Sequence, residues 1–264
     1  MRTSAYVMPF FALFAGFSGY YLRLMELWNV FDEQTGLPQR GAGITIALIA
    51  LTVVFLIIIA VFAVLVKIKR TSPRGFENAF GTEPLAYPLI FFIIGIVWLG
   101  ATVKYFVDAL AEGAIKTSEV FFAVLSALSA ISAAFFAMEI YQDPRRKAKL
   151  ALSVVPTLFM CFWLILLYKQ NASNPILLSY CYQCLALISS ALGFYFTSGY
   201  VFNRQAPAKT IYAFLAAIYF CFVALADKQT AGIKLIFIAV IAINLVYSSM
   251  LIKNLTAKSP ENTK

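Results

Sequence analysis

Residues 43–66 read GITIALIALTVVFLIIIAVFAVLV, a run of 24 residues without one charged side chain. A helix rises about 1.5 Å per residue, so a run of this length crosses the roughly 30 Å hydrocarbon core of a bilayer. Inside that core each backbone polar group needs a partner from within the segment, and a helix supplies one. The run therefore predicts a transmembrane helix.

Similar apolar runs recur along the whole chain. The predicted spans lie near residues 5–27, 43–66, 85–107, 118–140, 148–168, 176–201, 209–226 and 232–252. The connections between them are too short to hold a second domain. We therefore predict an all-α, polytopic transmembrane bundle of about eight spans over residues 1–264, with a short disordered tail at 254–264.

The overall composition agrees with a membrane protein. Of the 264 residues, 62% are hydrophobic and only 12% are charged, against about 25% charged in soluble domains. The mean hydropathy is +0.83. The net charge of +9 comes from short clusters between apolar runs, whereas phosphate binding needs a continuous basic face. The lipid bilayer is thus the predicted partner, and nucleic acid is not.

The distribution of lysine and arginine predicts which side each loop faces. Alternate loops and ends hold 14 of these residues on one side and 7 on the other, which accounts for all 21. Cytoplasmic loops accumulate positive charge, and both termini fall on the richer side. We therefore expect both termini in the cytoplasm, and we expect the plasma (cytoplasmic) membrane as the location.

Several classes of chemistry lack the residues they need. The chain has no histidine, which is the commonest metal ligand and the usual general base near neutral pH. Cys181 and Cys184 match C-x-x-C, but a thiolate within an apolar run is costly. We expect no metal and no cofactor, and the sequence leans against an enzyme.

Polar side chains within the sixth and eighth spans are the first candidate site. Gln183 and Asn244 lie well inside these runs, and Tyr180, Tyr182 and Tyr195 share the sixth span with Gln183. A few placed polar groups in an apolar cavity can orient a small ligand. The alternative is that they form hydrogen bonds between helices.

Charged residues at the predicted outer ends of helices are the second candidate site. Arg23 and Glu26 are three apart, Lys104 and Asp108 are four apart, and Glu119 opens the fourth span. Such spacings place each pair on one helical face, which predicts a polar outer vestibule. The alternative is that these side chains reach the lipid headgroups with only local partners. None falls at the bilayer centre, which argues against ion-coupled transport.

Three further features predict local structure. Small residues four apart, such as Ala12 and Gly16 in the first span and Ser126 and Ala130 in the fourth, predict close packing within the chain. The loop at 67–84 contains a possible short interfacial helix with Phe76 and Phe80. The first helix is expected to continue past the bilayer until Gly36 and Pro38 stop it.

Together these features favour a transporter component or a permease-like binder of a neutral, apolar or amphipathic small molecule or lipid. The alternative is a signalling or assembly module that docks a cytoplasmic protein partner through the basic loops at 67–74 and 145–149. These loops also fit the simpler explanation that they follow the topology rule and contact anionic lipid.

Overall fold

The computed structural model describes residues 4–32, 37–39, 41–72, 75–81, 86–111, 113, 116–142, 150–174 and 176–257. Its elements, in chain order, are α1 (Ser4–Asn29), α2 (Gly43–Lys69), β1 (Arg70–Thr71), α3 (Phe76–Phe80), α4 (Ala86–Ala111), α5 (Thr117–Gln142), α6 (Leu150–Asn171), the 3₁₀ turn η1 (Leu177–Ser179), α7 (Cys181–Val201), α8 (Pro207–Ala224), α9 (Ala231–Asn254) and β2 (Thr256–Ala257).

Eight helices in the described part of the chain are long and apolar enough to cross a membrane. They are α1, α2 and α4 to α9, and they coincide with the eight predicted spans to within a few residues. The prediction of an all-α bundle of about eight spans is confirmed. The chain is an integral, multi-pass membrane protein.

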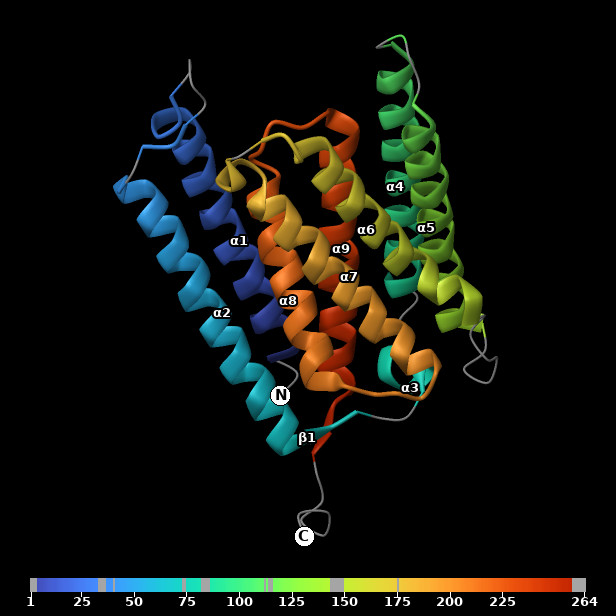
Figure 1. The fold of residues 1–264 in the computed structure, drawn as a ribbon. Coiled ribbons are helices and arrows are strands. Elements are labelled where there is room, and N and C mark those ends of the chain that lie inside the picture. The colour runs from blue at the N-terminus through green and yellow to red at the C-terminus, as the bar shows by residue number, and fades with distance from the viewer. Residues whose placement is uncertain are drawn as a thin grey trace.

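The bundle is built around α8 and α9. In the most apolar stretch of each of these two helices 72% of the residues are buried. The corresponding share is 28% in α2, which lies at the edge of the bundle. Figure 1 shows α1 and α2 on one side of this centre and the α4–α5 hairpin on the other, with both termini at the same end of the bundle. An even number of spans requires that placement. We call this end the termini end and the opposite one the cavity end.

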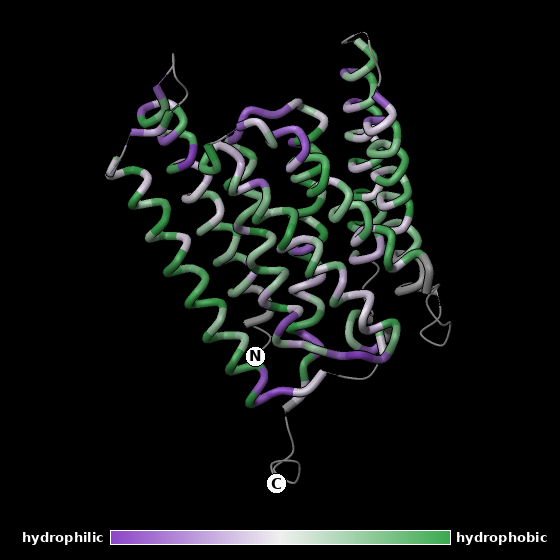
Figure 2. The backbone as a smooth tube through the Cα atoms, in the orientation of Figure 1, coloured by the Kyte–Doolittle hydropathy of each residue, from purple (hydrophilic) through white to green (hydrophobic). Residues whose placement is uncertain are grey.

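The outward surfaces of the helices are apolar. Ile46, Ile57 and Val61 of α2 are more than half exposed, and so is Phe14 of α1. Hydrophilic segments gather at the two ends of the bundle (Figure 2). Because lipid tails solvate such surfaces and water does not, the membrane-spanning helices contact the bilayer directly.

The termini end is closed by a short helix and a two-residue ribbon. Phe76 and Phe80 of α3 are buried in the bundle, so the predicted short helix exists but does not face the interface as expected. Asn254 holds it there, since its amide donates to the carbonyls of Ala79 and Gly81 at 3.0 and 2.9 Å. Residues at the end of a helix need such partners for their free carbonyls.

The first residues of the tail that we predicted to be disordered, 254–264, are ordered in the structure. Residue 254 is the last of α9, and Thr256 and Ala257 pair with Thr71 and Arg70 in an antiparallel register. The backbone groups of residues 256–257 thus find partners in β1. The polar sequence of the tail does not predict this pairing. Residues 258–264 lie outside the described residues.

Two other local predictions have clear outcomes. The small residues pack within the chain, as predicted: Gly16 lies against Phe222 of α8, and Gly95 of α4 lies against Ala130 and Ala134 of α5. The prediction that the first helix continues to Gly36 is wrong, because α1 ends at Asn29. Beyond it the Asp32 amide bonds to the Leu37 carbonyl at 3.1 Å, which replaces helical bonding; Gly36 itself lies outside the described residues.

Candidate functional site

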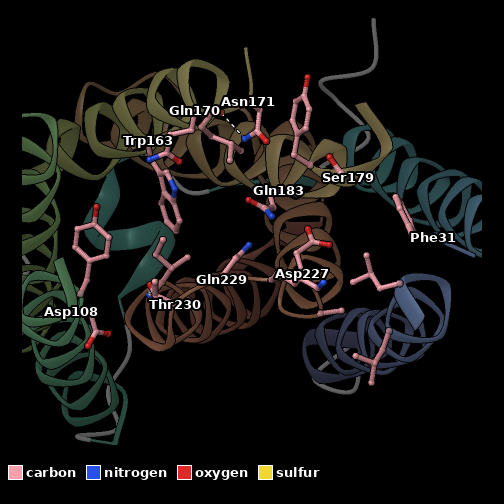
Figure 3. A pocket seen from close by; sticks show the side chains of 18 of the residues that line it. Phe31, Asp108, Trp163, Gln170, Asn171, Ser179, Gln183, Asp227, Gln229 and Thr230 are labelled. Carbon is pink, nitrogen blue, oxygen red and sulfur yellow. Dashed lines mark hydrogen bonds between the residues drawn. The ribbon is translucent and has the colours of Figure 1, made fainter. Parts of the chain in front are cut away.

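A cavity of about 940 Å³ opens at the cavity end of the bundle. Residues of α1, α4, α5, α6, α7 and α9 line it, together with η1 and the connection between α8 and α9 (Figure 3). Its polar lining includes Asp108, Glu119, Gln170, Asn171, Ser179, Gln183, Asp227, Gln229 and Thr230, and its aromatic lining includes Phe31, Tyr105, Trp163 and Tyr180. The cavity thus brings polar and aromatic side chains together, and ligand sites combine apolar surface with placed polar groups in the same way.

One side of the cavity rests on a buried arginine. Arg23 of α1 is 0% exposed. Its Nε donates to Asp227 Oδ1 at 2.8 Å and its Nη1 to Glu26 Oε2 at 2.6 Å. Its Nη2 donates to the carbonyls of Leu178 and Ser179 at 3.0 and 3.2 Å. All three guanidinium nitrogens are therefore satisfied by the protein, which a buried charge requires.

The same cluster joins four parts of the fold. Glu26 is also fully buried, and its Oε1 accepts a hydrogen bond from Thr45 of α2 at 2.6 Å. Arg23 thus connects α1 to η1 and to the α8–α9 connection, and Glu26 adds α2. The alternative interpretation, that Arg23 and Glu26 reach the headgroups with only local partners, is wrong because both side chains are enclosed by these elements.

Asp227 is the member of the cluster that borders the cavity. It is 2% exposed and lies in the connection that follows α8. Burial raises its pKa above the ordinary value, while Arg23 and Gln183 partly oppose that rise. Its Oδ2 is buried, and no donor among the described residues meets it with full hydrogen-bond geometry. The Gln183 amide lies beside this carboxylate (Figure 3) and lowers its pKa through a side-chain hydrogen bond.

Gln229 presents a second acceptor of the same kind. Its Nε2 donates to the Ala224 carbonyl at 3.3 Å, which fixes the amide. Its Oε1 is buried and, within the described part of the chain, has no partner. Because buried acceptors normally find a donor, these two oxygens are acceptors that a molecule in the cavity would satisfy.

The base of the cavity is aromatic. The ring of Trp163 lies 5.3 Å from that of Phe122, 5.6 Å from that of Phe159 and 4.7 Å from that of Phe237. Phe159 in turn contacts Trp98 at 6.0 Å between centroids. Trp163 lines the cavity, and the other rings, from α4, α5, α6 and α9, pack behind it.

The candidate ligand residues divide into two groups. Gln183 and Tyr180 line the cavity, and Tyr182 is buried beside them, its ring centroid 5.2 Å from the Arg23 guanidinium. Asn244 lies elsewhere: it is buried beside Gly193, its amide donates to the Val240 carbonyl at 2.8 Å, and its Oδ1 has no partner in the described structure. Tyr195 is 59% exposed on the outside of the bundle.

The other predicted vestibule residues lie on the opposite wall. Asp108 and Glu119 line the cavity. Lys104 forms the expected ion pair with Asp108 at 2.5 Å, and this pair is largely exposed. Glu119 accepts from the Lys116 backbone amide at 3.1 Å. The structure thus places Arg23 and Glu26 behind one wall and Asp108 and Glu119 at the other.

Sequence reasoning missed Asp227, Gln229 and Trp163. The first two lie in the short connection between the last two spans. An acid directly after an otherwise apolar span was the available signal. Its partner is 204 residues away, and nothing in the sequence pattern identifies that partner.

Among the described residues, no group of three or more histidine, cysteine, aspartate or glutamate side chains is placed to hold a metal ion. No family model, curated protein or solved structure matches the chain.

Proposed function

We propose that this protein is a permease-like membrane binder, or a transporter component, that takes an amphipathic small molecule or a lipid into the cavity. The observation that carries the proposal is the cavity itself, about 940 Å³ in volume with polar and aromatic lining. Its size falls within the range of small-molecule sites, and its lining has their mixed character.

The location of the cavity supports handling of a molecule from one side of the membrane. It opens at the cavity end, and the stack of rings around Trp163 lies beneath it. At the other end Phe80 packs between Tyr200 and Tyr247, each at 5.2 Å between centroids. A transporter that alternates between two open states would look like this in one of them.

The competing proposal, docking of a cytoplasmic partner through basic loops, has less to support it. The loop at 145–149 lies outside the described residues, and Arg70 at the end of α2 belongs to the β1–β2 ribbon. Ligand binding in the cavity is therefore the better supported function.

The test uses three probes that share one apolar body: 4-phenylbutylamine, 4-phenylbutanol and 4-phenylbutyrate. The purified protein in phosphatidylcholine nanodiscs is heated with each probe. A probe at about ten times its Kd stabilises the folded state by about 1.4 kcal/mol, so we expect at least one of the three to raise the Tm by about 3 to 5 °C.

Two variants locate the effect. Gln183→Leu removes a polar group from the cavity and is expected to abolish the shift. Tyr195→Phe removes a hydroxyl from the same helix outside the cavity and should keep it. If no probe raises the Tm, the cavity is not a ligand site. If Gln183→Leu keeps the full shift, Gln183 is not part of that site.

A further inference from the structure

The cavity has an excess of negative charge. Its lining includes the carboxylates of Asp32, Asp108, Glu119 and Asp227 and the ammonium of Lys228. Two more cations pair with lining carboxylates: Arg23, which is buried behind the wall, with Asp227, and the exposed Lys104 with Asp108. Even when Arg23 and Lys104 are counted, the carboxylates outnumber the cations. The buried Glu26 adds one more carboxylate. A cavity of this kind attracts cations.

The unsatisfied groups in the cavity wall are acceptors. Asp227 Oδ2 and Gln229 Oε1 are both buried and meet no donor with full hydrogen-bond geometry in the described structure, and both residues border the cavity. Asp227 is only 2% exposed, and its other carboxylate oxygen, Oδ1, already accepts a hydrogen bond from Arg23. A molecule with N–H or O–H donors would satisfy both oxygens, and the charge balance favours one that is positive.

A bare metal ion fits these observations poorly. No group of three potential metal-ligating acidic or cysteine side chains converges within the described residues, and calcium takes six to eight oxygen ligands. The aromatic lining points the other way. Trp163 and Tyr105 border the same space, and aromatic faces attract organic cations.

We propose that the cavity binds an organic ammonium ion, whose N–H groups donate to Asp227 Oδ2 and Gln229 Oε1 and whose apolar body lies against Trp163 and Tyr105. This inference rests on the proposed function and narrows its ligand class. Arg23 is a positioning residue: it holds Oδ1 of Asp227 and leaves Oδ2 for the ligand.

The experiment compares affinities of the same three probes, followed by tryptophan fluorescence, because Trp28 and Trp163 line the cavity. A primary amine is charged at neutral pH. A hydrogen bond to a charged group contributes about 1.5 to 3 kcal/mol, which is roughly tenfold or more in Kd. We expect 4-phenylbutylamine to bind at least tenfold more tightly than 4-phenylbutanol, and 4-phenylbutyrate to bind most weakly.

Variants assign the anchor. Asp227→Asn keeps an acceptor for Arg23 and is expected to weaken amine binding at least tenfold while weakening the alcohol much less, because only the amine loses an ion pair. Gln229→Leu should weaken the amine by about three- to tenfold, and it carries the test if Asp227→Asn does not fold. Gln205→Leu is the matched control, since it removes a buried glutamine amide outside the cavity.

The outcomes separate the two proposals. If the alcohol binds as tightly as the amine, the ammonium inference fails and the ligand-binding proposal stands. If the amine is preferred but both cavity variants retain wild-type affinity, the assignment to Asp227 and Gln229 is overturned. If no probe binds, the ligand-binding proposal fails and the ammonium inference fails with it.

The ammonium donors have two natural sources, a free amine and the headgroup of phosphatidylethanolamine. Repeating the titration in nanodiscs that contain phosphatidylethanolamine distinguishes them. Competition with 4-phenylbutylamine supports a lipid headgroup as the occupant, and an unchanged amine affinity supports a free amine.

Discussion

Arg23 shows how one buried side chain organises the cavity end. Its guanidinium is a planar fork with donors in fixed directions, and the structure places an acceptor in each: Glu26 three residues along α1, the carbonyls of η1, and Asp227. A buried cluster of charges adds little net stability to the protein, because removing the charges from water offsets their attraction. Each charge nevertheless needs the others as partners. Loss of one member leaves its partners buried and unpaired.

Arg23→Leu is therefore expected to destabilise the protein by about 3 to 5 kcal/mol, the usual cost of breaking a buried ion pair. The matched control is Lys104→Leu, which breaks the exposed pair with Asp108 and should cost less than about 1 kcal/mol. Thermal unfolding in detergent, monitored by size-exclusion chromatography, measures the loss of stability in both variants. Equal losses in the two variants would show that the Arg23 cluster is no more important than a surface pair.

At this scale the sequence predicted only near neighbours. The three-residue spacing of Arg23 and Glu26 and the four-residue spacing of Lys104 and Asp108 predicted pairs on one face, and both pairs are present. Asp227 was not predicted as a partner, because its approach to Arg23 depends on how α1 packs against α8. In lipid no hydrophobic effect drives the helices together. An apolar face therefore does not show which helices will be in contact.

The helices themselves were predictable because hydrocarbon demands long uninterrupted apolar runs. Their ends were less so. The sixth span was predicted from residue 176, but α7 begins at Cys181. Before it, Asn174 bonds to the Ile176 amide at 3.0 Å and to the Ser179 hydroxyl at 2.9 Å. Side-chain bonds of this kind compete with a helix, and hydropathy does not detect them.

The α4–α5 hairpin is held together by close backbone approach. A Cβ on Gly95 would lie 3.2 Å from the Ala130 carbonyl oxygen and from the Ala134 Cβ, whereas one on Gly100 of the same helix meets nothing within 4 Å. Gly95→Leu is therefore expected to destabilise the protein by about 1 to 3 kcal/mol through overpacking.

Gly100→Leu is the control for that variant, and its side chain points into open space. Its stability should stay at or slightly above wild type, because glycine is a poor helix former. Thermal unfolding of the two variants in the same detergent is the measurement. A loss of equal size at both positions would mean that α4 and α5 are not held by this contact.

The two ends of the whole molecule differ in structure as well as in charge. The cavity end is hollow and lined by acids, while α3 and the β1–β2 ribbon cover the termini end. Of the 21 lysine and arginine residues, the order of spans in the sequence assigns 14 to the side of both termini, which the topology rule predicts to be the cytoplasm. The cavity is then expected to open away from the cytoplasm, toward the side where the acidic lining would meet an external cation.

Single cysteines at two exposed threonines test that orientation. Thr117 begins α5 at the cavity end and Thr71 lies in β1 at the termini end. In intact cells a membrane-impermeant maleimide should label Thr117→Cys and should label Thr71→Cys only after permeabilisation, with the wild-type protein and its four native cysteines as the background. The reverse pattern would place the cavity in the cytoplasm, where any ammonium ligand would have to come from inside the cell. Labelling of both variants in intact cells would instead contradict opposite sidedness, and with it the assignment of these two loops to different ends of a membrane-spanning bundle.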